Sequence, residues 1–78
     1  MVDVLLPKMG MQTVEVDVIK VCVQVGDRVE VGDPIVEVES EKADMVINAE
    51  VAGTVAELLV AEGDVVEPGH VLARLNPE

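Results

Sequence analysis

Apolar and polar residues alternate along most of the chain. In segment 14–18, three valines are separated by Glu15 and Asp17, so one face is apolar and the other acidic at the two-residue period of a β-strand. The alternation continues through 19–25, but Ile19 and the valines up to Val25 now occupy odd-numbered positions, whereas the valines of 14–18 occupy even-numbered ones. A change of parity within one run indicates a bulge, or a strand that passes from one sheet to another. We therefore predict strand over both segments, with a bend between them.

Seven further segments have the composition of short strands, and turn signals separate them. The turns are expected at the Gly-Asp pairs 26–27 and 63–64, at the Gly-Asp-Pro of 32–34 and at the Pro-Gly of 68–69. The predicted strands are 2–6, 35–39, 45–50, 54–60 and 71–75, with brief ones at 28–30 and 65–67. This many short strands predicts an all-β sandwich or barrel.

An internal repeat relates the two halves of the chain. VGDRVEVGDPIVEVE at 25–39 aligns without gaps on EGDVVEPGHVLARLN at 62–76, at an offset of 37 residues. Because neither half can bury an apolar face alone, the halves should pack together with approximate two-fold symmetry. The polar connection at 39–44 is then equivalent to the chain termini, so we expect it at the opposite end of the domain.

Composition excludes several classes of function. The 78 residues carry a net charge of −11 and no Phe, Tyr or Trp, which argues against nucleic acid because phosphates need cations and bases need stacking partners. No apolar run approaches the roughly 20 residues that span a bilayer, and no targeting segment is recognisable. We expect a monomeric domain of the cytoplasm, or of the mitochondrial matrix in a processed eukaryotic chain, with no membrane partner.

The sequence offers few cysteine and histidine side chains for catalysis. Cys22 is the only cysteine and His70 the only histidine, so neither an internal disulfide nor a Cys/His zinc cluster can form. Cys22 lies within the alternating run and is read as a buried or half-buried apolar residue, and His70 follows a Pro-Gly turn and is read as a surface residue. We expect neither a catalytic site nor a metal.

Lys42 is the candidate for chemistry of another kind. It lies in ESEKADM, 39–45, and is one of three lysines in the chain. The neighbouring acids, Glu41 and Asp44 among them, favour its ammonium form, so it is not an activated nucleophile. Covalent modification by another enzyme stays open, because that requires only an accessible amine on a turn.

Three segments together resemble the lipoyl domains of the acyltransferase (E2) components of 2-oxo acid dehydrogenase complexes. They are LPKMGM at 6–11, the first repeat at 25–39 and ESEKADM at 39–45; Gly26 lies 16 residues before Lys42 and Gly53 lies 11 after it. The resemblance covers nearly the whole chain. It implies a flattened β-barrel or sandwich of two four-stranded antiparallel sheets, the barrel-sandwich hybrid, with a pseudo-two-fold repeat. It also implies that 1–78 is a single lipoyl domain at the N-terminus of a longer E2.

The same resemblance implies a cofactor and its site. Lys42 would carry lipoate in amide linkage, attached by a lipoate ligase or an octanoyl or lipoyl transferase, with Glu41 and Ala43 flanking it in the hairpin. Gly26, Gly53 and Gly63 would be structural turns. Contacts with the E1 enzyme are expected from the segment that holds Met9, Met11 and Gln12.

The function that the resemblance implies is that of a carrier. The lipoyl arm would be reductively acylated by a thiamin-diphosphate E1, would deliver the acyl group to coenzyme A at the E2 catalytic domain and would be reoxidised by the dihydrolipoyl dehydrogenase E3. The domain itself would be non-catalytic, and its parent a dihydrolipoyllysine acyltransferase.

Two alternatives stay open. Biotin carriers resemble lipoyl domains but read A-M-K-M around the modified lysine, whereas Glu41 and Ala43 flank Lys42 and the next methionine is Met45. Unmodified lipoyl-like modules also occur as structural or adaptor elements, and such a module would need no accessible lysine at the hairpin.

Overall fold

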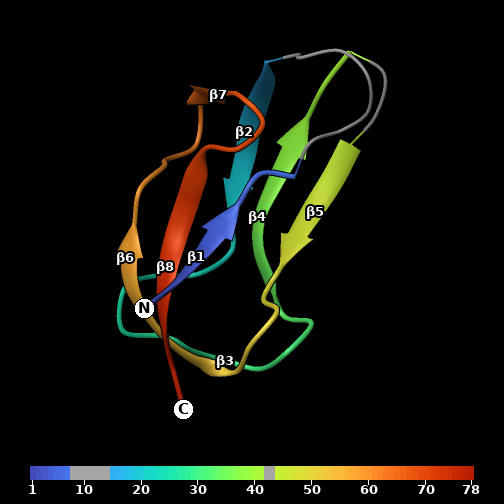
Figure 1. The fold of residues 1–78 in the computed structure, drawn as a ribbon. Coiled ribbons are helices and arrows are strands. Elements are labelled where there is room, and N and C mark those ends of the chain that lie inside the picture. The colour runs from blue at the N-terminus through green and yellow to red at the C-terminus, as the bar shows by residue number, and fades with distance from the viewer. Residues whose placement is uncertain (8–14, 42–43) are drawn as a thin grey trace.

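The computed structural model describes residues 1–7, 15–41 and 44–78, and in that part of the chain all regular structure is β (Figure 1). Two four-stranded antiparallel sheets have the orders β1-β8-β6-β3 and β5-β4-β2-β7. The strands are β1 Val2–Leu5, β2 Val16–Val21, β3 Arg28–Val29, β4 Pro34–Glu39, β5 Asp44–Asn48, β6 Gly53–Leu58, β7 Val65–Val66 and β8 Val71–Pro77. The predicted fold class is confirmed.

The two halves are related as the repeat predicts. A shift of 37 residues carries β2 onto β6, β3 onto β7 and β4 onto most of β8. The connecting hydrogen bonds repeat as well, because the Gly26 N–H donates to the Val55 carbonyl at 2.8 Å and the Gly63 N–H donates to the Val18 carbonyl at 2.8 Å. Each half thus uses its Gly-Asp turn to reach across to the other half, and neither half forms a complete sheet alone.

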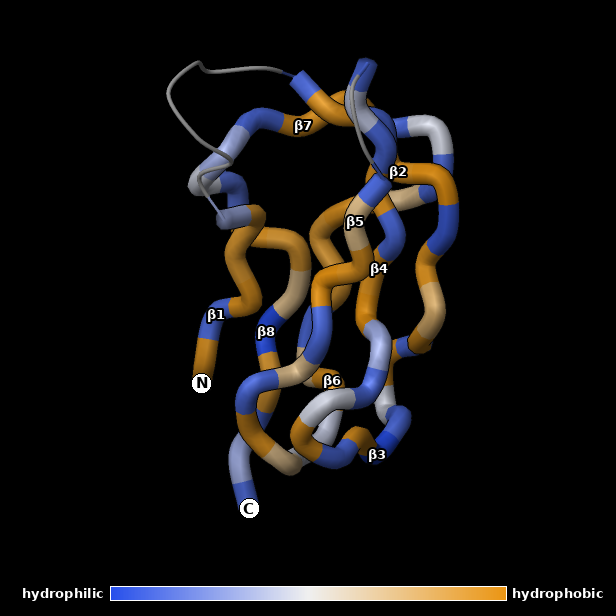
Figure 2. Tube along the Cα trace, turned by 90° about the vertical axis from the view of Figure 1, so that its right-hand side faces the viewer, coloured by the Kyte–Doolittle hydropathy of each residue, from blue (hydrophilic) through white to orange (hydrophobic). Residues whose placement is uncertain are grey.

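The core between the sheets is aliphatic. Its largest fully buried side chains are Leu6, Ile35, Leu72 and Leu75, and valines fill most of the remaining space. Hydrophobic stretches follow the strands in Figure 2, while the turns that join them are mainly hydrophilic. In the described part of the chain no polar side chain is buried, so the core is held by apolar burial and packing.

The bend predicted after Val18 is a β-bulge. The pairing of β2 with β4 shifts register between Val18 and Lys20, which leaves Ile19 43 % exposed. The prediction that strand continues to 25 was wrong: β2 ends at Val21, and Val25 is exposed in the following turn. The hydrogen bond from Gly26 to β6 explains this, because it draws the chain across to the other sheet. The other predicted strands are present with their ends within two residues.

The predicted turn glycines fall into two groups. Gly26 and Gly63 lie in turns with φ of 97° and 93°, a conformation that glycine adopts without steric cost. Gly53 is instead a buried residue that begins β6, so its prediction as a turn residue was wrong. A Cβ there would overlap the Asn76 carbonyl oxygen and lie 2.9 Å from the Pro77 Cα. Gly53 is required by the close approach of the β8 backbone.

Aspartates cap three of the four turns that the repeat creates. Asp27, Asp33 and Asp64 each accept, through Oδ2, a hydrogen bond of 2.8 to 2.9 Å from the backbone N–H three residues earlier. The fourth position is His70, whose backbone makes the same turn. Where the other three turns have a carboxylate, this turn has an imidazole, and among the described residues the His70 side chain accepts no hydrogen bond from the turn.

Substituting His70 by asparagine is expected to stabilise the domain. The Asn carbonyl can accept the missing hydrogen bond without adding to the net charge of −11, a gain of about 0.5 to 1.5 kcal/mol. Urea unfolding followed by far-ultraviolet circular dichroism measures the change, with His70→Ala as the matched variant that offers no acceptor. Equal stability of the two variants would contradict the assignment of the cap.

Candidate functional site

The last residue of β4 and the first residue of β5 lie at the end of the domain remote from both termini (Figure 1). β4 ends at Glu39, β5 begins at Asp44, and these two residues are directly opposite in the ladder. Of the hairpin residues between them, Ser40 is half-buried and Glu41 is exposed. The position predicted from the repeat is therefore confirmed for the ends of both strands.

Several predicted site residues lie outside the described part of the chain. Lys42 and Ala43 of the hairpin are among them. So are the predicted E1 contacts Met9, Met11 and Gln12. Their assigned roles stay predictions.

A row of carboxylates crosses three strands at the base of the hairpin. Asp17 on β2 is opposite Glu39, and Glu39 is opposite Asp44, and all three are exposed. Like charges directly opposite each other destabilise a sheet. In the other sheet the repeat places Thr54 and Asn76, which are neutral and also paired, at the positions of Asp17 and Glu39. Because the equivalent pair in the other sheet is neutral, the fold does not require acidic residues at the positions of Asp17 and Glu39.

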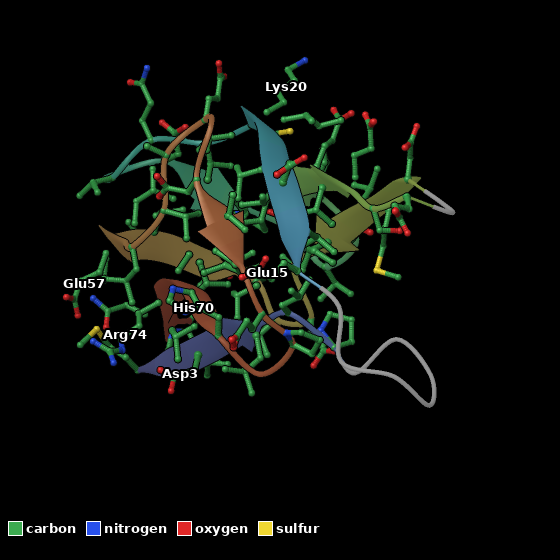
Figure 3. All side chains as sticks on the ribbon, turned by 90° about the horizontal axis from the view of Figure 1, so that it is seen from above. Asp3, Glu15, Lys20, Glu57, His70 and Arg74 are labelled. Carbon is green, nitrogen blue, oxygen red and sulfur yellow. The ribbon has the colours of Figure 1, made fainter. Side chains whose placement is uncertain are left out.

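The arginines bind carboxylates elsewhere. On the outer face of the other sheet, Arg74 lies between Asp3 and Glu57, at 3.1 and 3.2 Å (Figure 3). The hydrogen bond to Glu57, followed by that to Asp3, raises the pKa of the Arg74 guanidinium. Arg28 is paired with Glu30 and Glu78. Among the described residues, neither arginine forms an ion pair with the carboxylate row.

Cys22 and His70 lie where the sequence predicted. The Cys22 side chain is half-buried, and its thiol contacts the Glu37 carboxylate at 3.8 Å. Burial, with the adjacent Glu37 charge, raises the pKa of the thiol, which disfavours the reactive thiolate. His70 is exposed. Within residues 1–7, 15–41 and 44–78, no group of three acidic, histidine or cysteine side chains is arranged to hold a metal ion.

The described part of the chain has no helix long and apolar enough to cross a membrane.

Comparison with known families agrees with this architecture. Residues 2–75 match the biotin/lipoyl family described as "Biotin-requiring enzyme". The chain belongs to this family. The family resemblance inferred from the hairpin and the repeat is thereby confirmed, since the match covers both halves.

Relatives of this biotin/lipoyl domain include components of two dehydrogenase complexes and of an acetoin cleaving system. It is 41 % identical over 74 residues to the dihydrolipoyllysine-residue acetyltransferase component of the pyruvate dehydrogenase complex of Corynebacterium glutamicum, covering 95 % of this chain and 11 % of that protein. It is 38 % identical over 73 residues to the succinyltransferase component of the 2-oxoglutarate dehydrogenase complex of Staphylococcus saprophyticus, covering 94 % and 17 %. It is 41 % identical over 75 residues to the acetyltransferase component of the acetoin cleaving system of Bacillus subtilis, covering 96 % and 19 %. The chain thus spans less than a fifth of the length of these relatives.

Sequence reasoning did not find the carboxylate row of this biotin/lipoyl domain. The sequence shows acidic residues alternating with apolar ones in segments 14–18 and 35–39. It does not show the register that places Asp17 opposite Glu39. A predicted hairpin with Glu39 opposite Asp44 would have given one of the two pairings in the row.

Proposed function

We propose that this chain is a lipoyl carrier domain and that Lys42 is its attachment residue. The observation that carries the proposal is the β4–β5 connection, which holds Lys42 in sequence and begins and ends at the tip of the domain opposite both termini. A tether at either terminus leaves that tip free to enter another active site. The relatives support the choice of lipoate over biotin, because each is named as a dihydrolipoyllysine-residue acyltransferase component.

The residues around the hairpin fit a covalently attached arm. Glu39, Glu41 and Asp44 are exposed, so a modifying enzyme can approach the connection from the solvent. Of the described residues, Glu39, Glu41 and Asp44 line neither the cleft between β1 and β5 nor the cavity beside β3. Lipoate, when attached, supplies a dithiolane that carries acyl groups and electrons. The chain provides the surface that other enzymes recognise and holds the arm at the tip of the domain.

The proposed parent is a longer E2 acyltransferase of which 1–78 is the N-terminal, non-catalytic domain. In this role the domain presents Lys42 in turn to a thiamin-diphosphate E1, to the coenzyme A site of the E2 catalytic domain and to E3. Tethering raises the effective concentration of the hairpin at each site without any new contact. The carboxylate row of Asp17, Glu39 and Asp44 gives the presenting end a charge that cationic surfaces on those enzymes can recognise.

The test is modification of the intact chain. After incubation with a lipoate ligase, ATP and lipoic acid, mass spectrometry is expected to show one lipoyl group per chain. Lys42→Arg should lose the modification completely, because an arginine cannot form the amide. Lys20→Arg is the matched control, since Lys20 is an exposed lysine near the end of β2 and not on the hairpin, and it should be modified like the unsubstituted chain.

A parallel reaction with a biotin ligase distinguishes the alternative cofactor. Biotin at Lys42 in place of lipoate would move the domain to carboxylase chemistry. If neither enzyme modified the chain, the carrier proposal would be wrong and an unmodified adaptor module would remain.

A further inference from the structure

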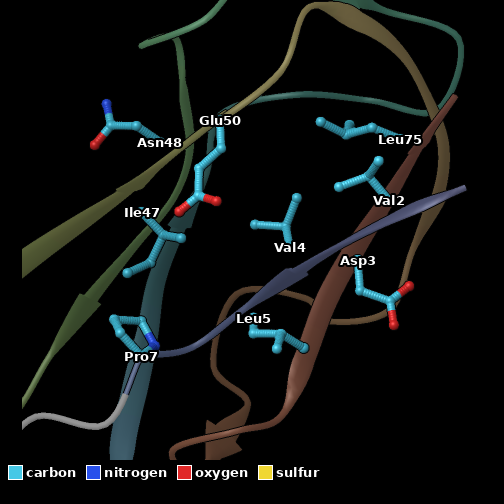
Figure 4. Close-up of a pocket in the computed structure, with 9 residues that line it drawn as sticks. All are labelled: Val2, Asp3, Val4, Leu5, Pro7, Ile47, Asn48, Glu50 and Leu75. Carbon is cyan, nitrogen blue, oxygen red and sulfur yellow. The ribbon is translucent and has the colours of Figure 1, made fainter. Parts of the chain in front are cut away.

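A cleft of about 200 Å³ separates β1 from β5 (Figure 4). Val4 and Ile47, both buried core residues, line it from opposite sides, and Leu75 also contributes. Asn48 and Glu50 add polar groups on the β5 side. The cleft is therefore an opening into the apolar core, with polar groups along one wall.

The walls of this cleft are the edges of the two sheets. β1 pairs with β8 and β5 pairs with β4, and each is the outermost strand in its sheet. All four consecutive residues of β1 line the cleft, although successive side chains of a strand point to opposite faces. The cleft thus follows the backbone edge of β1 itself. An open edge presents backbone donors and acceptors to any extended chain that fits beside it.

Glu50 gives the cleft a negative charge that is not neutralised within the described residues. Its side chain is exposed, and its carboxylate lies over the cleft in Figure 4. Among residues 1–7, 15–41 and 44–78 it makes neither an ion pair nor a hydrogen bond. Asp3, the other acid at the cleft, differs because Arg74 holds it at 3.1 Å. A cation bound at the cleft would therefore pair with Glu50.

We propose that the β1 edge binds an extended segment of a partner polypeptide as a fifth strand of its sheet. An apolar side chain of the segment enters the cleft between Val4 and Ile47, and a lysine or arginine two residues away, on the same face of the added strand, pairs with Glu50. This is peptide recognition by strand addition, in which main-chain hydrogen bonds give affinity and alternate side chains give specificity. A second copy of this chain is a poor occupant, because both copies carry a net charge of −11.

This interaction goes beyond the proposed carrier function and does not depend on Lys42. The hairpin tip and the β1 edge are separate surfaces, so a partner on β1 would leave the hairpin available to an enzyme. A failure to bind peptide would leave the lipoylation result unaffected, and a failure to attach lipoate would leave the peptide result unaffected.

The test uses a fluorescein-labelled peptide of repeating Val-Thr-Lys-Thr, which places valine and lysine on the same face of an added strand, with binding followed by fluorescence anisotropy. Backbone amide spectra of the isotopically labelled chain locate the site. The expected result is binding with shifts at Val2–Leu5 and around Ile47. A peptide N-methylated at every second residue keeps the side chains and charges but cannot pair as a strand on the blocked edge. It is expected to bind at least tenfold more weakly, because its main-chain hydrogen bonds to β1 are lost.

Two charge variants complete the test. Glu50→Gln should weaken binding roughly threefold to fivefold, as for one exposed ion pair. Glu62→Gln removes the same charge from an exposed turn outside the cleft and should bind like the unsubstituted chain. Equal binding of the two peptides, or equal loss in the two variants, would mean unspecific attraction to an acidic protein and would overturn the proposal. So would the absence of binding, or a dimer of this chain that blocks β1.

Discussion

Alanine at Gly53 is expected to destabilise the domain by about 3 kcal/mol or more, because the added Cβ meets backbone that cannot move aside. The overlapping atoms are the Asn76 carbonyl and the Pro77 Cα of β8, which pairs with β6 along this stretch. A domain of this size has a total stability of about 4 to 12 kcal/mol, so much of it would be lost. Far-ultraviolet circular dichroism in urea measures the loss, since the chain has no Trp or Tyr to report by fluorescence.

Gly32→Ala separates the effect of this overlap from the general effect of adding a methyl group. Gly32 has a φ of 94°, but a Cβ there would meet nothing within 4 Å. Its replacement should cost about 1 kcal/mol from backbone strain alone. If Gly53→Ala were no more harmful than Gly32→Ala, β8 would have to lie further from β6 than described.

Leu72→Ala is the other substitution with a large expected effect. Leu72 is fully buried, at 0 % exposure, and it lies in β8 between the two sheets. Truncation removes buried methyl groups and leaves a cavity, at a cost of about 2 to 5 kcal/mol. The midpoint of urea unfolding should fall accordingly, with the slope of the transition unchanged because the fold is retained.

Leu59→Ala is the matched control for this prediction. Leu59 donates its backbone N–H to the Leu72 carbonyl at 2.9 Å, so both leucines belong to the same part of the fold, but its side chain is 40 % exposed. The same change at Leu59 should cost less than about 1 kcal/mol, since less apolar area is lost. Comparable losses at the two positions would show that Leu72 is not a core residue.

The sequence predicted what depends on local periodicity and on the repeat. Alternation located the strands, because one face of each strand is buried in the aliphatic core. The parity change after Val18 located the bulge. The repeat predicted where the β4–β5 connection lies, because two similar halves that need each other pack most simply about a two-fold axis.

What the sequence could not supply depends on contacts between distant strands. Val23 and Val25 continue the alternation, yet the chain leaves the sheet after Val21 because Gly26 hydrogen-bonds to β6. Gly53 is predicted as a turn residue only by the family resemblance, and only the approach of β8 shows its role. The cleft beside Glu50 follows from which two strands lie at the sheet edges, and the sequence does not record that order.

The pairing of the first and last strands has a mechanical consequence. β1 and β8 are antiparallel neighbours, with Val2 opposite Leu75, so the two termini emerge at the same end. A force that pulled the termini apart would open this ladder one residue pair at a time, from Val2 towards Leu5, because the load falls on the outermost hydrogen bonds. Force between a terminus and the hairpin would instead run along the strands and be shared by many bonds. The domain should therefore unzip readily when stretched between its ends and resist tension directed through its tip.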